Sequence, residues 1–298
     1  MHKNREAGHH DTNSPRFAVV LSDTDNDLAS VQYALNVVGV CDKQGAWRTG
    51  IRDIRVIHTG DWLNKWNPSA EIVDYFMELS HTAPPSCDLL ILNGNHELRI
   101  LQRAEKGEHP HLGEKRLAFI RSRDLLHVYG KTLFLHGYPT CYLLKFLQQI
   151  KNEKKGLNRF NERIRKAFYE GSHALFRKEE GQVLMGNIKK AQHYYREPCQ
   201  DGEIRGIKIS ELLKTIGIRT VVHGHRPNIK VQQDNEFNLE TPGIRLVNND
   251  NQPKTSLLGA AIVDIKGDVT FVNSREMIWQ GGEKKFKNKI RKFLGIET

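Results

Sequence analysis

Residues 89–97 read Leu-Leu-Ile-Leu-Asn-Gly-Asn-His-Glu. The four consecutive apolar residues predict a short strand that is buried on both faces. Gly94 ends this strand, and the next three residues, Asn95, His96 and Glu97, are placed on the following turn. Open α/β sheets build their sites in this way, with polar side chains at the carboxyl ends of buried strands. On its own the pattern is ambiguous, because a Gly-Asn turn that caps a helix has the same appearance.

Four other predicted strands end in residues that can bind a metal. Asp23 and Asp25 follow the strand predicted over residues 16–21, and Asp61 follows the one over 54–58. His136 follows the strand predicted over 131–135, and His223 and His225 follow the one over 220–222. Because such loops converge at one edge of a sheet, we expect these side chains to lie together. Carboxylate, amide and imidazole groups together suit two divalent ions bridged by one carboxylate. Two ions about 3.5–4 Å apart clamp a phosphate group and activate a bridging water.

Two of these endings also have ordinary structural explanations. Asp23, Asp25 and Asp27 precede a predicted helix that carries Leu28 and Val31 on one face, so some of these acids serve to cap that helix. Capping needs one or two acids, so three at alternate positions favour metal ligation. His223 is a candidate metal ligand. It is equally well explained as a histidine of the core, or as one that contacts the ligands without binding the metal.

Composition limits the function classes without choosing among them. The chain has 298 residues, 38% of them apolar, which suffices for one large α/β domain or two small ones. The net charge of +10 suits anionic partners in general: phosphoproteins, nucleotides, nucleic acid or acidic lipid. The four cysteines show no CxxC spacing, which indicates reduced thiols. Without a signal peptide or an apolar run of about 18 residues, we expect a cytoplasmic protein, although export without a signal is compatible with the sequence.

Three segments differ in composition from the rest of the chain. Residues 1–15 are polar and predict a disordered leader. Residues 139–196 predict an all-helical insertion, placed like a cap at the edge of the sheet that carries the motifs. Residues 276–298 predict a basic amphipathic tail, which either docks on the domain or contacts an anionic surface, membrane or nucleic acid. Between these segments, strands over 244–247, 257–264 and 269–272 are predicted to be antiparallel.

The order of the motifs resembles that of the calcineurin-like metallophosphoesterases. The matching residues are Asp23-x-Asp25, Gly60-Asp61-x-x-Asn64, Gly94-Asn95-His96-Glu97, His136-Gly137 and Gly224-His225. The chain looks most like the phosphoprotein phosphatase (serine/threonine phosphatase) branch and its bacterial relatives, over about residues 16–275. The resemblance implies an α/β fold: a β-sandwich of two mixed sheets flanked by helices, here with the helical insertion added.

The resemblance also implies a role for each matching residue. Asp23 would bind the first metal, Asp61 would bridge both metals, and Asn95, His136 and His225 would bind the second. His96 would act as the general acid, while Lys65, Arg99 and Arg226 lie near the motifs and are candidates for contacting the substrate phosphate. The implied cofactors are two divalent ions, manganese, iron or zinc in the family, and the implied partner is a phosphorylated substrate, most often a protein.

Three positions depart from the family pattern. Asp25 stands where the family has a histidine ligand, and a harder carboxylate there favours Mn²⁺ or Mg²⁺ over iron or zinc. Asn64 stands where the family has the aspartate that orients the catalytic histidine, so we expect Asn64 to accept a hydrogen bond from His96 but to stabilise its charged form less well. Lys65 replaces an arginine and supplies charge without a bidentate fork.

These observations support three functional hypotheses. The leading one is a metal-dependent phosphomonoesterase acting on phosphoproteins, in which a hydroxide activated by two metals attacks the phosphate in line. The second is a nucleotide or nucleic-acid phosphodiesterase that uses the same site. The third is a weakly active family member that serves as a binding module. The presence of ligands for both apparent metal sites in this chain argues against the third. Neither the oligomeric state nor the choice among phosphoserine, phosphothreonine and phosphotyrosine follows from the sequence.

Overall fold

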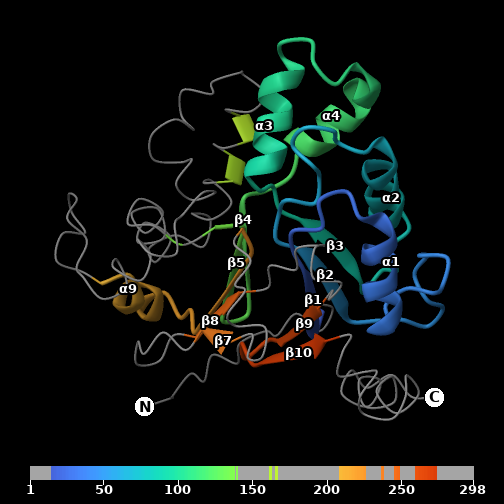
Figure 1. The fold of residues 1–298 in the computed structure, drawn as a ribbon. Coiled ribbons are helices and arrows are strands. Elements are labelled where there is room, and N and C mark those ends of the chain that lie inside the picture. Colours follow the sequence, from blue (N-terminus) through green and yellow to red (C-terminus); the bar gives the residue numbers. More distant parts are fainter. Residues whose placement is uncertain are drawn as a thin grey trace, which may run out of the picture.

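The computed structural model describes residues 15–137, 139, 161–162, 165–166, 208–225, 236–237, 245–248 and 259–273. Nearly all of the predicted leader, most of the predicted helical insertion, the basic tail and Arg226 lie outside these residues. Within the described part, the predicted α/β architecture is confirmed: two mixed sheets are flanked by helices (Figure 1).

The first sheet carries the strand from the stretch 89–97. Its five strands run in the order β10-β9-β1-β2-β3 and span Val269–Asn273, Gly259–Asp264, Phe17–Leu21, Ile54–His58 and Asp88–Ile91. β1, β2 and β3 are parallel, whereas β9 pairs antiparallel with both β1 and β10. The carboxyl ends of β1, β2 and β3 therefore meet at one edge, as the sequence predicts.

The second sheet brings the histidine motifs to the same region. Its strands run in the order β4-β5-β6-β8-β7 and span Leu126–Tyr129, Thr132–Leu135, Thr220–His223, Arg245–Asn248 and Glu236–Phe237. β5, β6 and β8 are parallel, and β4 and β7 are antiparallel to their neighbours. The prediction that the strand near 244–247 pairs antiparallel with the strands after it was wrong. It lies in the other sheet, because a pattern of apolar residues identifies a strand but not its partner.

Helices flank the two sheets (Figure 1). The described helices are α1 (Leu28–Val37), α2 (Ala70–His81), α3 (Asn95–Ala104), α4 (Gly113–Arg121) and α9 (Ile209–Thr215), with a 3₁₀ turn, η1, over Pro110–Leu112. Asn95 and His96 thus open a helix, whereas the sequence placed them on a turn. Of the helices in the described ranges, none is long and apolar enough to cross a membrane.

Alternate side chains of β1 pack into two different layers of the core. Ala18 and Val20 face one way and Val19 and Leu21 the other, and all four are fully buried. The first pair belongs to a cluster that includes residues of β5, β6 and β9, so this layer lies between the two sheets. The second pair belongs to the larger cluster that includes residues of α1 and α2. Burial on both faces explains why β1 reads as a continuous apolar run.

Candidate metal and catalytic site

The segments that follow β1, β2, β3, β5 and β6 carry five of the predicted ligands. They hold Asp23, Asp61, Asn95, His136 and His225, respectively. The backbone of the β6 loop is tied to the β1 loop, because the amide of His225 donates to both carboxylate oxygens of Asp23 at 3.1 and 3.0 Å. The backbone of α3 is tied to the β2 loop, because the amide of His96 donates to Asp61 Oδ1 at 2.9 Å.

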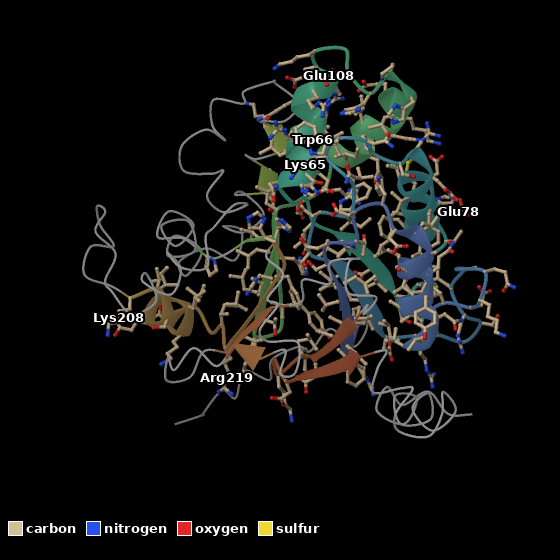
Figure 2. All side chains as sticks on the ribbon, in the orientation of Figure 1. Lys65, Trp66, Glu78, Glu108, Lys208 and Arg219 are labelled. Carbon is tan, nitrogen blue, oxygen red and sulfur yellow. The ribbon has the colours of Figure 1, made fainter. Side chains whose placement is uncertain are left out.

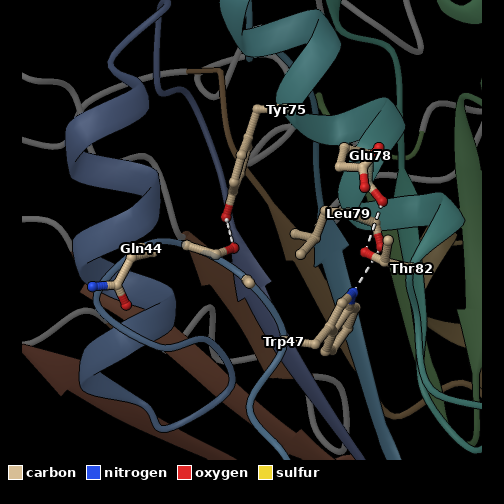
Figure 3. A pocket seen from close by; sticks show the side chains of 8 residues that line it. Gln44, Trp47, Tyr75, Glu78, Leu79 and Thr82 are labelled. Carbon is tan, nitrogen blue, oxygen red and sulfur yellow. Dashed lines mark hydrogen bonds between the residues drawn. The ribbon is translucent and has the colours of Figure 1, made fainter.

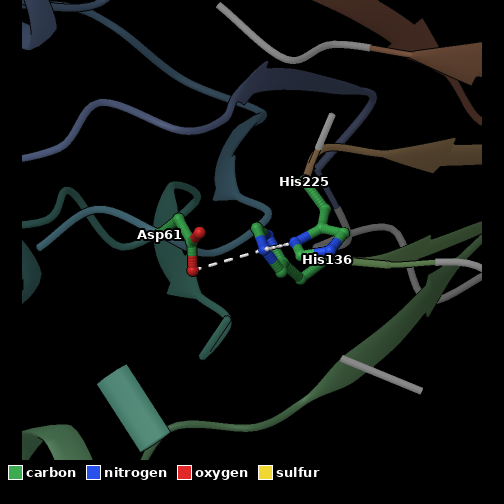
Figure 4. Close-up of side chains that lie close together, drawn as sticks. All are labelled: Asp61, His136 and His225. Carbon is green, nitrogen blue, oxygen red and sulfur yellow. Dashed lines mark hydrogen bonds and ion pairs between the residues drawn. The ribbon is translucent and has the colours of Figure 1, made fainter. Parts of the chain in front are cut away.

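The ligand atoms of Asp61, His136 and His225 all lie within 4.8 Å of one another (Figure 4). His136 Nε2 is 3.0 Å from Asn95 Oδ1, 3.1 Å from His225 Nδ1 and 3.2 Å from Asp61 Oδ1. On the other side of its ring, His136 Nδ1 donates to the carbonyl of Thr59 at 3.2 Å. A single nitrogen carries at most one proton, so His136 Nε2 can form a hydrogen bond with only one of these three neighbouring atoms at a time. The donor set fits a divalent cation.

The electrostatics of the cluster favour a positive charge at this point. Burial by itself would lower the pKa of His136, but the Asp61 and Asp23 carboxylates outweigh it and raise the pKa to about 10. Burial would raise the pKa of Asp61, but His136 and His96 lower it to about 2. Burial, reinforced by Asp61 and opposed by His136, raises the pKa of Asp23 to about 6. The cluster therefore holds either a proton or a metal cation among its carboxylates.

Unusual backbone geometry marks the site. Asp23, Asp25, Asp61 and His225 have φ values of 49°, 47°, 54° and 77°, in the left-handed region. A residue with a side chain in this region costs about 1–2 kcal/mol and persists where its surroundings hold it. Four of the predicted ligands thus share a backbone conformation that secondary structure does not require, which is typical of functional loops.

Two glycines of the motifs are required by close packing. A Cβ atom at Gly94 would collide with the carboxylate and the backbone nitrogen of Asp61. A Cβ atom at Gly224 would collide with the carboxylate of Asp23 and the hydroxyl of Ser22. These glycines therefore let neighbouring loops approach the two carboxylates closely.

His96 contacts two carboxylates through its two ring nitrogens. Nδ1 lies 2.9 Å from Asp25 Oδ1 and 3.0 Å from the carbonyl oxygen of Leu63, and Nε2 lies 3.3 Å from Asp61 Oδ2. Burial would lower the pKa of His96, but Asp25 and Asp61 outweigh it and raise the pKa. Nε2 points at the cluster and Nδ1 is held from behind, an arrangement suited to a general acid.

This arrangement differs from the sequence-based prediction at two residues. Asn64 was expected to orient His96, but its Oδ1 accepts from the backbone amides of Trp66 and Asn67 at 3.0 and 3.2 Å. Asp25 was expected to bind the first metal, but its carboxylate contacts His96. The reason is geometric: the amide of Asn64 stabilises its own turn, and the loop after β1 brings Asp25 to the histidine instead.

Glu97 is a residue whose importance the sequence reasoning missed. Its fully buried carboxylate accepts from the backbone amides of Gly94 at 2.7 Å, Asp61 at 3.0 Å and Leu63 at 2.9 Å. It therefore joins the start of α3 to the loop that carries Asp61. The spacing was a usable signal, because a glutamate three residues after an N-cap reaches back to the N-cap amide.

The remaining candidate ligand lies apart from this cluster. His223 is fully buried, its Nδ1 lies 2.9 Å from the carbonyl oxygen of Gly224, and burial lowers its pKa to about 4. Among the described residues, the group of side chains that converges as a metal site contains Asp61, His136 and His225 but not Asp23, Asp25 or His223.

The candidate substrate-binding residues lie at the rim. Arg99 is an exposed residue of α3, and its guanidinium carbon lies 4.6 Å from the ring centroid of Trp66. Lys65 is half-buried and follows Asn64 in the loop after β2. Arg226 was the third candidate and is outside the described residues.

A separate pocket of about 290 Å³ lies between α2 and the loop before Trp47 (Figure 3). Trp47 Nε1 donates to the carbonyl of Leu79 at 2.7 Å, and the hydroxyl of Tyr75 donates to the carbonyl of Gly45 at 2.9 Å. None of the candidate ligands lines it. These bonds hold the loop on α2, so we assign the pocket a structural origin.

Comparison with solved structures finds the same fold in known phosphatases. A cold-active protein tyrosine phosphatase aligns with a TM-score of 0.56 at 16% identity, covering 87% of this chain and 79% of that one. The enzyme of that description from a psychrophilic Shewanella species aligns with a TM-score of 0.51 at 15% identity, covering 87% and 80%. A Saccharomyces cerevisiae serine/threonine phosphatase aligns with a TM-score of 0.48 at 13% identity, covering 89% and 81%. At these identities, the likeness to the first two, whose TM-scores exceed 0.5, shows the fold alone.

Comparison of the sequence with family models identifies the chain. The model of the calcineurin-like phosphoesterases matches residues 20–228, more than half of the chain, whereas no curated protein sequence matches significantly. The matched region contains every motif that carries the resemblance. The chain belongs to the calcineurin-like phosphoesterase family, whose members use divalent metal ions and hydrolyse phosphoric esters.

Proposed function

We propose that this protein is a metal-dependent phosphomonoesterase that acts on phosphoproteins. The observation that carries the proposal is the convergence of Asp61, Asn95, His136 and His225 beside His96. The order of the motifs supports a phosphoprotein as the substrate. The solved structures that share the fold include proteins described as protein tyrosine phosphatases, which is compatible with this choice.

The cluster would hold a divalent ion through Asp61, Asn95, His136 and His225, and a second ion would be shared between Asp61 and Asp23. When bound, such ions lower the pKa of a coordinated water and offset the charge that develops on the phosphoryl oxygens. We propose manganese, because oxygen atoms from Asp61 and Asn95 stand beside the two imidazoles.

The chain itself would supply the acid. His96 holds a proton at Nε2 and donates it to the departing oxygen of the substrate. The Leu63 carbonyl accepts from Nδ1 and fixes the ring, and the Asp25 carboxylate, 2.9 Å from Nδ1, stabilises its charged form. Asp25 thereby takes the part that the sequence assigned to Asn64. Good general-acid assistance contributes about 10²–10⁴-fold to rate.

Hydrolysis of a chromogenic phosphomonoester, measured beside its phosphodiester analogue with added Mn²⁺, tests this function. We expect turnover of the monoester and its loss in Asp61→Asn. Preference for the diester would replace the proposal with the phosphodiesterase hypothesis. If the protein binds Mn²⁺ but hydrolyses neither compound, only the binding-module hypothesis remains.

A second measurement addresses the substrate class. Phosphate release from peptides that carry phosphoserine, phosphothreonine or phosphotyrosine should exceed release from mononucleotides at equal concentration. Faster release from the nucleotides would refute the phosphoprotein assignment and retain the phosphomonoesterase.

A further inference from the structure

An aromatic and basic surface adjoins the candidate site. It consists of Lys65, Trp66, Arg99 and Arg103, and we call it the Trp66 surface; Figure 2 shows Lys65 and Trp66 beside α3. Trp66 is 55% exposed, more than any other large apolar residue in the described part of the chain. The guanidinium carbons of Arg99 and Arg103 lie 4.6 and 5.0 Å from the centroid of its ring.

Hydrogen bonds hold the backbone of the loop that carries this ring. The amide of Trp66 donates to Asn64 Oδ1 at 3.0 Å, and Asn26 Nδ2 donates to the carbonyl of Asn67 at 2.6 Å. Arg103 pairs with Glu108 at 2.5 Å, and its Nη1 donates to the carbonyl of Lys65 at 3.4 Å. The surface is therefore organised before any ligand binds, which lowers the entropic cost of binding.

Two of the cations on the Trp66 surface are available to an anion. Arg103 is neutralised by Glu108, but no carboxylate within the described ranges lies at ion-pair distance from Lys65 or Arg99. Arg99 follows His96 by three residues on α3, so their Cβ atoms lie about 5–6 Å apart on the same side of the helix. The available charge is thus within one helical turn of the proposed acid.

We propose that the Trp66 surface binds an acidic side chain of the substrate, an aspartate or glutamate within about three residues of the phosphorylated one. This inference rests on the proposed phosphoprotein phosphatase function and names its preferred substrate. An extended peptide advances about 3.3–3.6 Å per residue, so two or three residues span the distance from the site to Arg99. A nucleobase is a poorer occupant, because it needs a free ring face and two guanidinium groups already lie over this ring.

Two phosphopeptides that differ only in their flanking residues test the proposal. One carries aspartates at the second and third positions on either side of the phosphorylated residue, and the other carries asparagines there. We expect kcat/KM to be about fivefold higher for the acidic peptide with the wild-type protein. The ratio should fall below one in Arg99→Glu and approach one in Trp66→Leu, which removes the ring that holds Arg99. Because each ratio compares two substrates of one variant, weaker phosphate binding or partial unfolding cancels.

The matched control is Arg219→Glu, which makes the same charge change at an exposed arginine remote from α3 (Figure 2). It should retain the wild-type ratio.

Equal kcat/KM for the two peptides in the wild type, or an acidic preference that survives in Arg99→Glu, would overturn the inference and leave the phosphatase function intact. Turnover of a chromogenic monoester without release from either peptide would refute both the inference and the phosphoprotein assignment. Inhibition by a single-stranded oligonucleotide that is lost in Arg99→Glu, without a peptide preference, would assign the surface to nucleic acid instead.

Discussion

Asp25 Oδ1 lies 2.9 Å from Nδ1 of His96, although Asp25 is in the loop after β1 and His96 is in the first turn of α3. A carboxylate behind the imidazole keeps the ring oriented and favours its protonated form. The carboxylate that contacts the histidine thus comes from the motif Asp23-x-Asp25. The motif Gly60-Asp61-x-x-Asn64 ends in an amide instead. The contact lets a chain that departs from the family pattern at both positions retain an aspartate–histidine pair.

Replacement of Asp25 by asparagine should weaken the acid. We expect turnover to fall about 10–100-fold for phosphate esters of alcohols, whose leaving oxygen needs a proton. Esters of acidic phenols should be affected much less, because their leaving groups depart without one. The measurement is kcat across a series of esters of increasing leaving-group pKa, whose slope should steepen in Asp25→Asn. If Asn64→Ala steepens the slope and Asp25→Asn does not, Asn64 orients the histidine.

Metal binding should stabilise the fold through Asp61. Its carboxylate is 4% exposed and shares the cluster with His136 and His225, so the ion binds the folded chain and not the unfolded one. Mn²⁺ at 100 times its dissociation constant then adds about 2.7 kcal/mol to the free energy of unfolding. Thermal unfolding with Mn²⁺ and with a chelator should show this as a rise in Tm, and Asp61→Asn should abolish it. Asp74→Asn, an exposed acid paired with Arg116, should keep the full rise. An equal rise in Asp61→Asn would place the ion elsewhere.

A methyl group at Gly94 should disrupt the site more than the fold. The added Cβ meets the carboxylate of Asp61, so Gly94→Ala should lose bound metal and activity and lower the free energy of unfolding by about 1–3 kcal/mol. Gly107→Ala is the comparison, because a Cβ there meets nothing within 4 Å. Its positive φ predicts a loss of about 1 kcal/mol with activity retained. Metal analysis and urea unfolding of both variants measure the difference, and full metal content in Gly94→Ala would contradict the prediction.

His127 should make the fold sensitive to mild acid. Burial and the neighbouring Arg55 lower the pKa of His127 to about 4, and Arg55 NH1 donates to its Nε2 at 2.9 Å. A histidine whose folded pKa lies below its unfolded value binds fewer protons when folded. Its contribution to stability is therefore complete above about pH 6.5 and is lost as the pH falls toward 4.

His127→Gln should flatten this part of the dependence, measured as the free energy of unfolding at pH 7.5 and at pH 5. His81→Gln, at an exposed position at the end of α2, should leave it unchanged. An equally steep loss of stability in His127→Gln would assign the acid sensitivity to other groups.

Much of the strand framework followed from local patterns. β2 was predicted with its observed bounds, and β1, β3, β5 and β6 within one or two residues, because apolar runs that end at polar loops are local signals. β7, a strand of two residues, was not predicted, and β8 was identified as a strand but assigned to the wrong sheet. Pairing between strands far apart in the chain leaves no local signal of its own.

The sequence by itself determined the family, the order of the motifs and the set of residues available to bind metal. Those follow from residue types at fixed spacings. Only the tertiary structure decided how they are paired: Asp25 with His96, Asn64 with its own turn, and Glu97 with three backbone amides. The physical reason is that Asp25 and Asn64 both lie in loops near one edge of the sheet, so either could serve the histidine. The loop after β1 brings Asp25 to the histidine: Asp25 has a φ of 47°, and its amide donates to the carbonyl of Asp61 at 3.1 Å.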